Sequence, residues 1–227
     1  MHRVVLELER AFGSKPMTRD IEVGIVWRLL GERPPEFHQG IKPYTFHFED
    51  AGNECYRLSF SSVLPSLTDE VTLAARNLLS SQTALECCGI SFRIRKITPI
   101  QDLTFYSNAV RMISLSGCRV ICKKDVHGKF VERTIHAERN PQSFIQAMTR
   151  MLAAKTKLFL GKEVSEDEIQ IQYLKLLDSE QIDFHHSKQC GQYVTFRISA
   201  PKEVLETAAY SGIGRKTGCG FGAVAVI

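Results

Sequence analysis

The alternation of apolar and polar residues predicts that the chain begins with a strand followed by a helix. Val4, Leu6 and Leu8 recur at every second position, which is the period of a half-buried strand. Residues 18–30 place apolar side chains about four positions apart, which is typical of a helix, and Gly31 follows as a stop signal.

The remainder of the first half continues with the same two periods. We predict strands over 44–48, 56–60 and 90–97 and a helix over 67–79. The resulting order, β-α-β-β-α-β, is that of a ferredoxin-like domain.

The second half repeats this order less regularly. Asn140 and Pro141 are typical of a helix start, and Gly161 of its end. The other predicted elements are strands over 113–123, 169–177, 182–186, 194–198 and 222–227 and a helix over 201–210. We therefore expect an α+β protein of two tandem ferredoxin-like (RRM-like) domains, over residues 1–105 and 106–227. An aromatic RNP1-type pattern is absent from the sequence, so base stacking on a sheet face is not indicated.

Charge is unevenly distributed along the chain. The 29 Lys and Arg exceed the 25 Asp and Glu by only +4, yet residues 91–133 are mainly basic and residues 163–183 mainly acidic. This separation favours a polyanion bound on one face. Seven cysteines without a C-x-x-C pair argue against zinc and for a reducing cytoplasm. We expect no metal and no cofactor, and no segment is apolar enough to span a membrane.

Residues 212–222 form the most distinctive stretch, with five glycines around Arg215 and Lys216. Glycine lets the backbone approach a ligand closely and turn successive N–H groups toward an anion. The two cations favour phosphate. The stretch follows a predicted helix and precedes a strand, which is the reverse of a nucleotide P-loop. The alternative is a helix cap followed by a flexible hairpin.

This stretch resembles the glycine-rich loop of the CRISPR-associated repeat-cleaving endoribonucleases of the RAMP superfamily. Gly212-Ile213-Gly214 and Gly220-Phe221-Gly222 match its two halves. A second stretch, in which His38 precedes the run Lys42-Pro43-Tyr44-Thr45-Phe46, resembles the catalytic-histidine region of the same enzymes.

The resemblance implies metal-independent cleavage of precursor CRISPR RNA within its repeats, by attack of a ribose 2′-OH, to give 2′,3′-cyclic phosphate and 5′-OH ends. His38 is then the general base or general acid, and Lys42 stabilises the pentavalent phosphate. The expected RNA-binding residues are Gly212, Gly214, Arg215, Lys216, Gly218, Gly220 and Gly222, together with Arg93, Arg95, Lys123 and Lys124. The last four either follow the RNA backbone or belong to an ordinary solvated sheet face.

Two other functions are compatible with the sequence. One is a RAMP-superfamily subunit that binds RNA in a CRISPR ribonucleoprotein without cutting it. The other is a ferredoxin-like metabolic or regulatory domain whose glycine-rich loop holds a small phosphorylated ligand. Beyond repeat RNA, other CRISPR-associated proteins and a second copy of the chain are further partners to consider.

Overall fold

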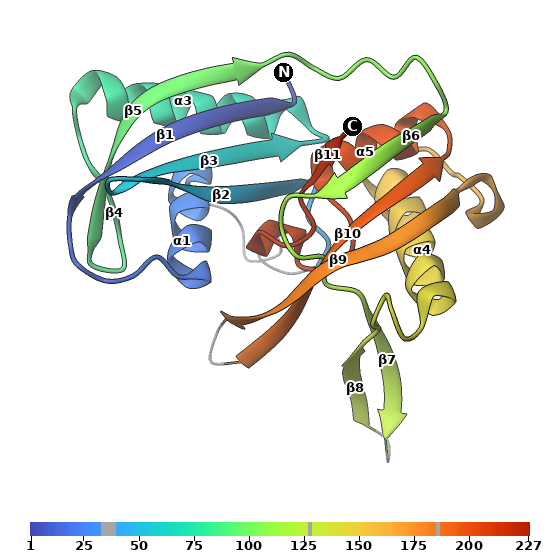
Figure 1. Cartoon of the computed structure of the whole chain (residues 1–227). Coiled ribbons are helices and arrows are strands. Elements are labelled where there is room, and N and C mark those ends of the chain that lie inside the picture. Colours follow the sequence, from blue (N-terminus) through green and yellow to red (C-terminus); the bar gives the residue numbers. More distant parts are fainter. Residues whose placement is uncertain (33–39, 127–128, 185–186) are drawn as a thin grey trace.

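The computed structural model contains two β-sheets, each covered by helices, and a hairpin that projects from the second half (Figure 1). It describes residues 1–32, 40–126, 129–184 and 187–227, without the side chains of residues 123–131 and 173. The elements are β1 (Arg3–Phe12), α1 (Arg19–Leu30), β2 (Tyr44–Gly52), β3 (Cys55–Ser62), α3 (Pro65–Ser81), β4 (Leu85–Cys87), β5 (Ile90–Ile100), β6 (Ala109–Ser114), β7 (Ile121–Val126), β8 (Lys129–Thr134), α4 (Pro141–Leu160), β9 (Gln170–Phe184), β10 (Ser187–Ser199), α5 (Lys202–Ser211) and β11 (Val224–Val226), with 3-10 turns at Glu166–Glu168 and Thr217–Cys219.

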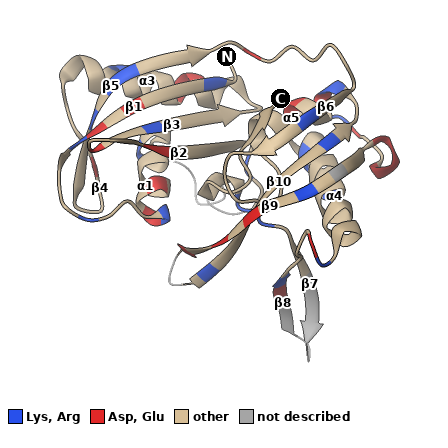
Figure 2. Cartoon of the chain, viewed as in Figure 1, with Lys and Arg blue, Asp and Glu red and all other residues tan. Residues whose placement is uncertain are grey.

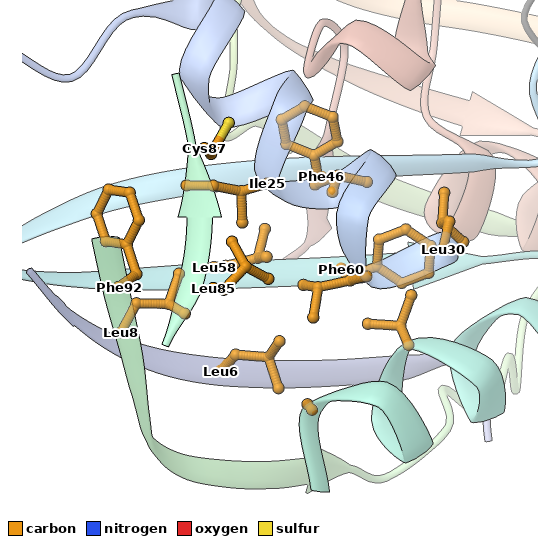
Figure 3. Packing of buried hydrophobic residues seen from close by; sticks show 14 of the residues in the cluster. Leu6, Leu8, Ile25, Leu30, Phe46, Leu58, Phe60, Leu85, Cys87 and Phe92 are labelled. Atoms are coloured by element: carbon orange, nitrogen blue, oxygen red, sulfur yellow. The ribbon is translucent and has the colours of Figure 1, made fainter. Parts of the chain in front are cut away.

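The first sheet has the strand order β2-β3-β1-β5-β4, and its neighbouring strands are antiparallel. β5 occupies the place of the fourth strand of a ferredoxin-like domain, and β4 adds a short edge strand. The buried face consists of the alternating residues of β1, β3 and β5, which pack with α1 (Figure 3). Leu6, Leu8 and Phe60 are at most 1% exposed, because every second side chain of a strand points to the same face.

The second sheet has the order β11-β6-β10-β9. In chain order these are its fourth, first, third and second strands, so the ferredoxin-like arrangement occurs twice. Phe144 and Met148 of α4 and Phe196 of β10 belong to a second hydrophobic cluster. The β7–β8 hairpin is inserted between the first strand and the first helix of this half (Figure 1). The predicted fold class, α+β with tandem ferredoxin-like arrangements, is confirmed.

Helix ends follow the local sequence signals. The Thr18 side chain accepts a hydrogen bond from the Ile21 N–H and caps α1, and Gly31 ends that helix at φ 71°. Gly161 ends α4 in the left-handed conformation at φ 66°. These ends are set by single residues, and for this reason the sequence places them within a residue of their observed positions.

Two predicted strand boundaries are wrong. The expected strand over 113–123 is interrupted after Ser114, and β7 begins only at Ile121. Between them Gly117 lies so close to Gly191 that a β-carbon on Gly117 would be 2.7 Å from the Gly191 Cα. The strands expected over 169–177 and 182–186 are one strand, β9, because its polar middle stays paired with β10, as at Asp178 opposite Tyr193.

No helix within the part of the chain that the structure describes is long and apolar enough to cross a membrane.

Candidate nucleic-acid interface

The glycine-rich loop, residues 212–222, lies between the two halves of the molecule. It leaves the end of α5 and leads into β11. Ile213 is fully buried in the hydrophobic cluster of the second half, whereas Cys219 packs against the cluster of the first half. The Thr45 hydroxyl of β2 donates a hydrogen bond of 3.3 Å to the Phe221 carbonyl. The loop is therefore a packed connection between the two halves.

Its glycines allow close contact with the protein itself. A β-carbon on Gly214 would lie 2.7 Å from the Arg119 carbonyl oxygen, and one on Gly220 would lie 2.5 Å from Nη1 of Arg19. A β-carbon on Gly218 would collide with the aliphatic part of the Lys42 side chain. A side chain at Gly214 would press against Arg119 within the second half, whereas side chains at Gly218 and Gly220 would push the two halves apart.

Several loop N–H groups also bond to the protein. The Ile213 N–H donates to the Gly222 carbonyl, the Arg215 N–H to that of Arg119 and the Gly222 N–H to that of Gly117. These groups are thus used to fix the loop. These three N–H groups therefore do not point at an anion, as we had expected of the loop. The loop instead presents side chains to the solvent, since Arg215 is exposed.

Lys155 of α4 braces the start of this loop from inside. Its Nζ, on a residue that is 1% exposed, donates hydrogen bonds to the carbonyl oxygens of Ser211 (2.9 Å) and Gly212 (2.8 Å) and to Oγ1 of Thr217 (3.3 Å). Burial lowers the pKa of Lys155 to about 7. The last carbonyls of α5 have negative partial charge, which favours a cation at this place.

A basic pocket of about 300 Å³ opens beside the loop. The charged residues that line it are Lys42, Arg119, Glu132, Lys155, Arg215 and Lys216. Lys42 comes from the first half and the other five from the second. Such a gathering of cations, with Glu132 as the acidic residue among them, is suited to an anionic ligand.

Besides Lys155, three of these groups have pKa values that are shifted by the environment of the pocket. Burial lowers the pKa of Lys42, and burial together with the nearby Arg119 lowers that of Lys216. The pKa of Glu132 is lowered, chiefly because its carboxylate accepts a hydrogen bond of 2.8 Å from Nη2 of Arg119. Glu132 is therefore ionised at neutral pH and offsets part of the positive charge.

The structure brings together some of the predicted site residues. Lys42, Arg215 and Lys216 line one pocket. Arg93 and Arg95 lie on β5, which two strands separate from β2 in the first sheet, and Arg95 forms an ion pair with Glu9.

Three other predicted site residues, Lys123, Lys124 and His38, lie wholly or partly outside the described residues. Lys123 and Lys124 belong to β7, but their side chains are outside what the structure describes. His38 also lies outside the described residues. Charges of both signs occur along the visible strands of both halves (Figure 2).

Two of the cations that line the pocket were not selected from the sequence. Arg119 appeared there only as one of many cations in the basic region 91–133. Lys155 was missed, although it lies three positions after Leu152 and seven after Met148, on the apolar face of its helix. No group of three or more His, Cys, Asp or Glu side chains suited to a metal ion occurs among the described residues.

Replacement of Gly222 by alanine tests the packing of the loop. Gly222 (φ 70°) and Gly161 (φ 66°) have similar φ angles, but a β-carbon on Gly222 would collide with the Ile213 carbonyl, whereas nothing lies within 4 Å of one on Gly161. Gly161→Ala should cost about 1 kcal/mol of unfolding free energy from backbone strain, and Gly222→Ala about 3 kcal/mol or more because overpacking is added. Denaturant unfolding of both variants measures the difference, and equal losses would contradict the close packing.

Replacement of Lys155 tests the internal brace. Lys155→Met leaves buried carbonyl oxygens without a donor and should lower the unfolding free energy by at least about 2 kcal/mol. Lys157→Met, two residues along the same helix and 66% exposed at its side chain, should change it by less than about 0.5 kcal/mol. The comparison is made by denaturant unfolding at pH 7. A Lys155→Met variant as stable as Lys157→Met would show that the brace is not needed.

Comparison with known proteins identifies the family. The family model described as CRISPR associated protein Cas6, C-terminal, matches residues 97–226. Similar solved structures include an RAMP protein binding different RNA substrates, which has 16% identity and a TM-score of 0.79 over the whole of both chains.

A Cas6-related protein from Pyrococcus furiosus is also similar, with 16% identity and a TM-score of 0.79 over 100% of this chain and 98% of that one. A Cas6 product complex has 16% identity and a TM-score of 0.70 over 100% and 99% of the two chains. No curated protein matches the sequence. The resemblance suggested by the glycine-rich loop is confirmed, and the chain belongs to the Cas6 family of CRISPR-associated proteins.

Proposed function

We propose that the protein is an endoribonuclease that cuts precursor CRISPR RNA within its repeats without a metal ion. The observation that supports this most is the basic pocket, to which both halves of a Cas6-family fold contribute cations. A ribose-phosphate chain has one negative charge per residue, and the binding of such a chain is the common use of clustered Lys and Arg side chains.

In this proposal the reaction is an internal phosphoryl transfer. The 2′-OH attacks the adjacent phosphorus, a P–O bond to the next nucleotide breaks, and the products are a 2′,3′-cyclic phosphate and a 5′-OH. One proton leaves the 2′-oxygen and one joins the departing 5′-oxygen. His38 takes the first or supplies the second, because an imidazole exchanges protons near neutral pH.

Lys42 is suited to stabilise the extra negative charge of the pentavalent phosphate. It lines the pocket together with Gly40 and Ile41, and Gly40 follows His38 by only two positions in the sequence. Its side chain is partly removed from water, and a cation in such surroundings interacts more strongly with a phosphate than a fully hydrated one.

The glycine-rich loop then holds the RNA backbone through Arg215 and Lys216, while its glycines keep those side chains beside Lys42. We also propose that Arg93, Arg95, Lys123 and Lys124 contact RNA outside the pocket.

We also propose the division into domains at 1–105 and 106–227. Each part has its own hydrophobic cluster, although Phe184 packs into the first cluster and Val63 into the second.

A non-cleaving RNA-binding subunit is the second candidate. The observation in its favour is that the cations lining the pocket suit the binding of an RNA backbone whether or not the RNA is cut. Purified protein incubated with the repeat RNA distinguishes the two functions by the presence or absence of a shorter product. The RNA for this assay is found by sequencing what co-purifies with the protein.

His38→Ala should abolish cutting in the presence of EDTA and leave RNA affinity within about twofold, because the imidazole moves a proton and contributes little to binding. General acid–base catalysis contributes about 10²- to 10⁴-fold in rate, so single-turnover cleavage is the appropriate measurement. His136→Ala is the matched control and should cut at the wild-type rate. Undiminished cutting by His38→Ala would remove this residue from the mechanism.

The pair Arg215→Ala and Lys216→Ala should reduce RNA affinity and its dependence on salt. Each lost contact with a phosphate of single-stranded RNA lowers the slope of log K against log salt by about 0.7. The control pair, Lys157→Ala and Lys162→Ala, removes the same charge from exposed positions outside the pocket. Equal slopes for the two double variants, measured by filter binding, would mean that the loop cations do not contact the RNA.

A further inference from the structure

Arg119 occupies a special position in the basic pocket. Its backbone forms an antiparallel bridge with Arg215, whose N–H donates to the Arg119 carbonyl at 2.8 Å. Its side chain is only 8% exposed, although the residue lines the pocket. The same residue thus fixes the backbone of the glycine-rich loop and places a guanidinium behind the cations of that loop.

One end of this guanidinium is fixed and the other is not. Nη2 donates to the Glu132 carboxylate at 2.8 Å. Nη1 is buried and finds no hydrogen-bond acceptor among the described residues. A buried N–H without an acceptor costs about 1–3 kcal/mol, and more when the group is charged, so an acceptor that arrives with a ligand would relieve this cost.

The neighbours of Arg119 indicate the charge of such a ligand. Lys216 is close enough for Arg119 to lower its pKa, and both line the pocket with Arg215. Against these three cations stands Glu132, which already accepts the hydrogen bond from Nη2. The balance of charge is positive, and the acceptor that fits is an anion with several oxygens.

We propose that Arg119 binds a phosphate of the RNA in the pocket through Nη1, with Glu132 as the residue that orients its guanidinium. The proposal rests on the proposed RNA-binding function and adds to it a residue with a defined role. Arginine is suited to this role because its planar fork can bond a carboxylate with one edge and a phosphate oxygen with another.

The two partners of this one ion pair allow a sharp test. Arg119→Met removes the phosphate donor, whereas Glu132→Gln keeps the donor and removes a negative charge from the pocket. If Arg119 binds phosphate, Arg119→Met should weaken affinity for repeat RNA about 10- to 100-fold, as expected for a charge-assisted hydrogen bond. It should also lower the salt slope by about 0.7. Glu132→Gln should leave the affinity unchanged or raise it about threefold.

A purely structural ion pair predicts a different result, since both variants would then lose stability and RNA affinity together. That result overturns the proposal, as does an Arg119→Met variant with wild-type affinity. Arg119→Lys provides a folded variant if Arg119→Met fails to fold. It keeps the charge without the fork, and its affinity should lie between those of wild type and Arg119→Met.

A measurement without RNA separates this inference from the proposed function. Inorganic pyrophosphate should raise the thermal midpoint of the wild type and of Glu132→Gln, and raise that of Arg119→Met or Arg119→Lys less. If no repeat RNA binds but the pyrophosphate effect depends on Arg119, the RNA function fails and the anion site stands. If RNA binds equally to wild type and the Arg119 variants and pyrophosphate makes no distinction between them, the Arg119 site fails and the RNA function stands.

Discussion

The site depends on the contact between the glycine-rich loop and both halves of the protein. The loop backbone lies against Arg119 of the second half and against Lys42 and Phe46 of the first, at distances that leave no room for a β-carbon at Gly214, Gly218 or Gly220. Because these contacts fix the backbone from both sides, the separation between the loop cations and Lys42 is determined by packing. A site assembled across two halves requires such a constraint, since side-chain rotations alone would leave its cations at variable distances.

The same arrangement concentrates positive charge, and this has an energetic consequence. Two unit charges about 6 Å apart near a protein surface repel by roughly 3 kcal/mol, so several cations around one pocket destabilise the folded protein. Three features offset the repulsion: Glu132 pairs with Arg119, the end of α5 accepts the Lys155 ammonium, and Lys216 lies 5.4 Å from the centre of the Phe184 ring. Binding of a polyanion, as proposed above, would release what is left of the repulsion.

The sequence predicts the parts of this molecule that local patterns determine. Alternation at Val4, Leu6 and Leu8 defines β1, and the glycine at 161 ends α4 where expected. The sequence does not reveal what lies next to a glycine. At Gly214, the absence of a β-carbon is equally consistent with a nearby ligand and with the Arg119 carbonyl that the structure places there. Nor does a count of charges distinguish Arg119, whose partners in the folded chain are Arg215 and Glu132. Three-dimensional contacts of this kind leave no periodic signal in the chain.

The partial burial of Lys42 is more than a by-product of packing. Its aliphatic part fills the space beside Gly218, and loss of water lowers the pKa of its ammonium. The cost of removing this water is met when the protein folds, by the apolar packing of the loop and β2. A phosphate that arrives later meets a cation that is already in place and already poorly hydrated, which is the condition under which an electrostatic contact stabilises a developing charge most. Folding and the proposed chemistry therefore depend on the same glycine, because a side chain at 218 would displace Lys42 and restore its water.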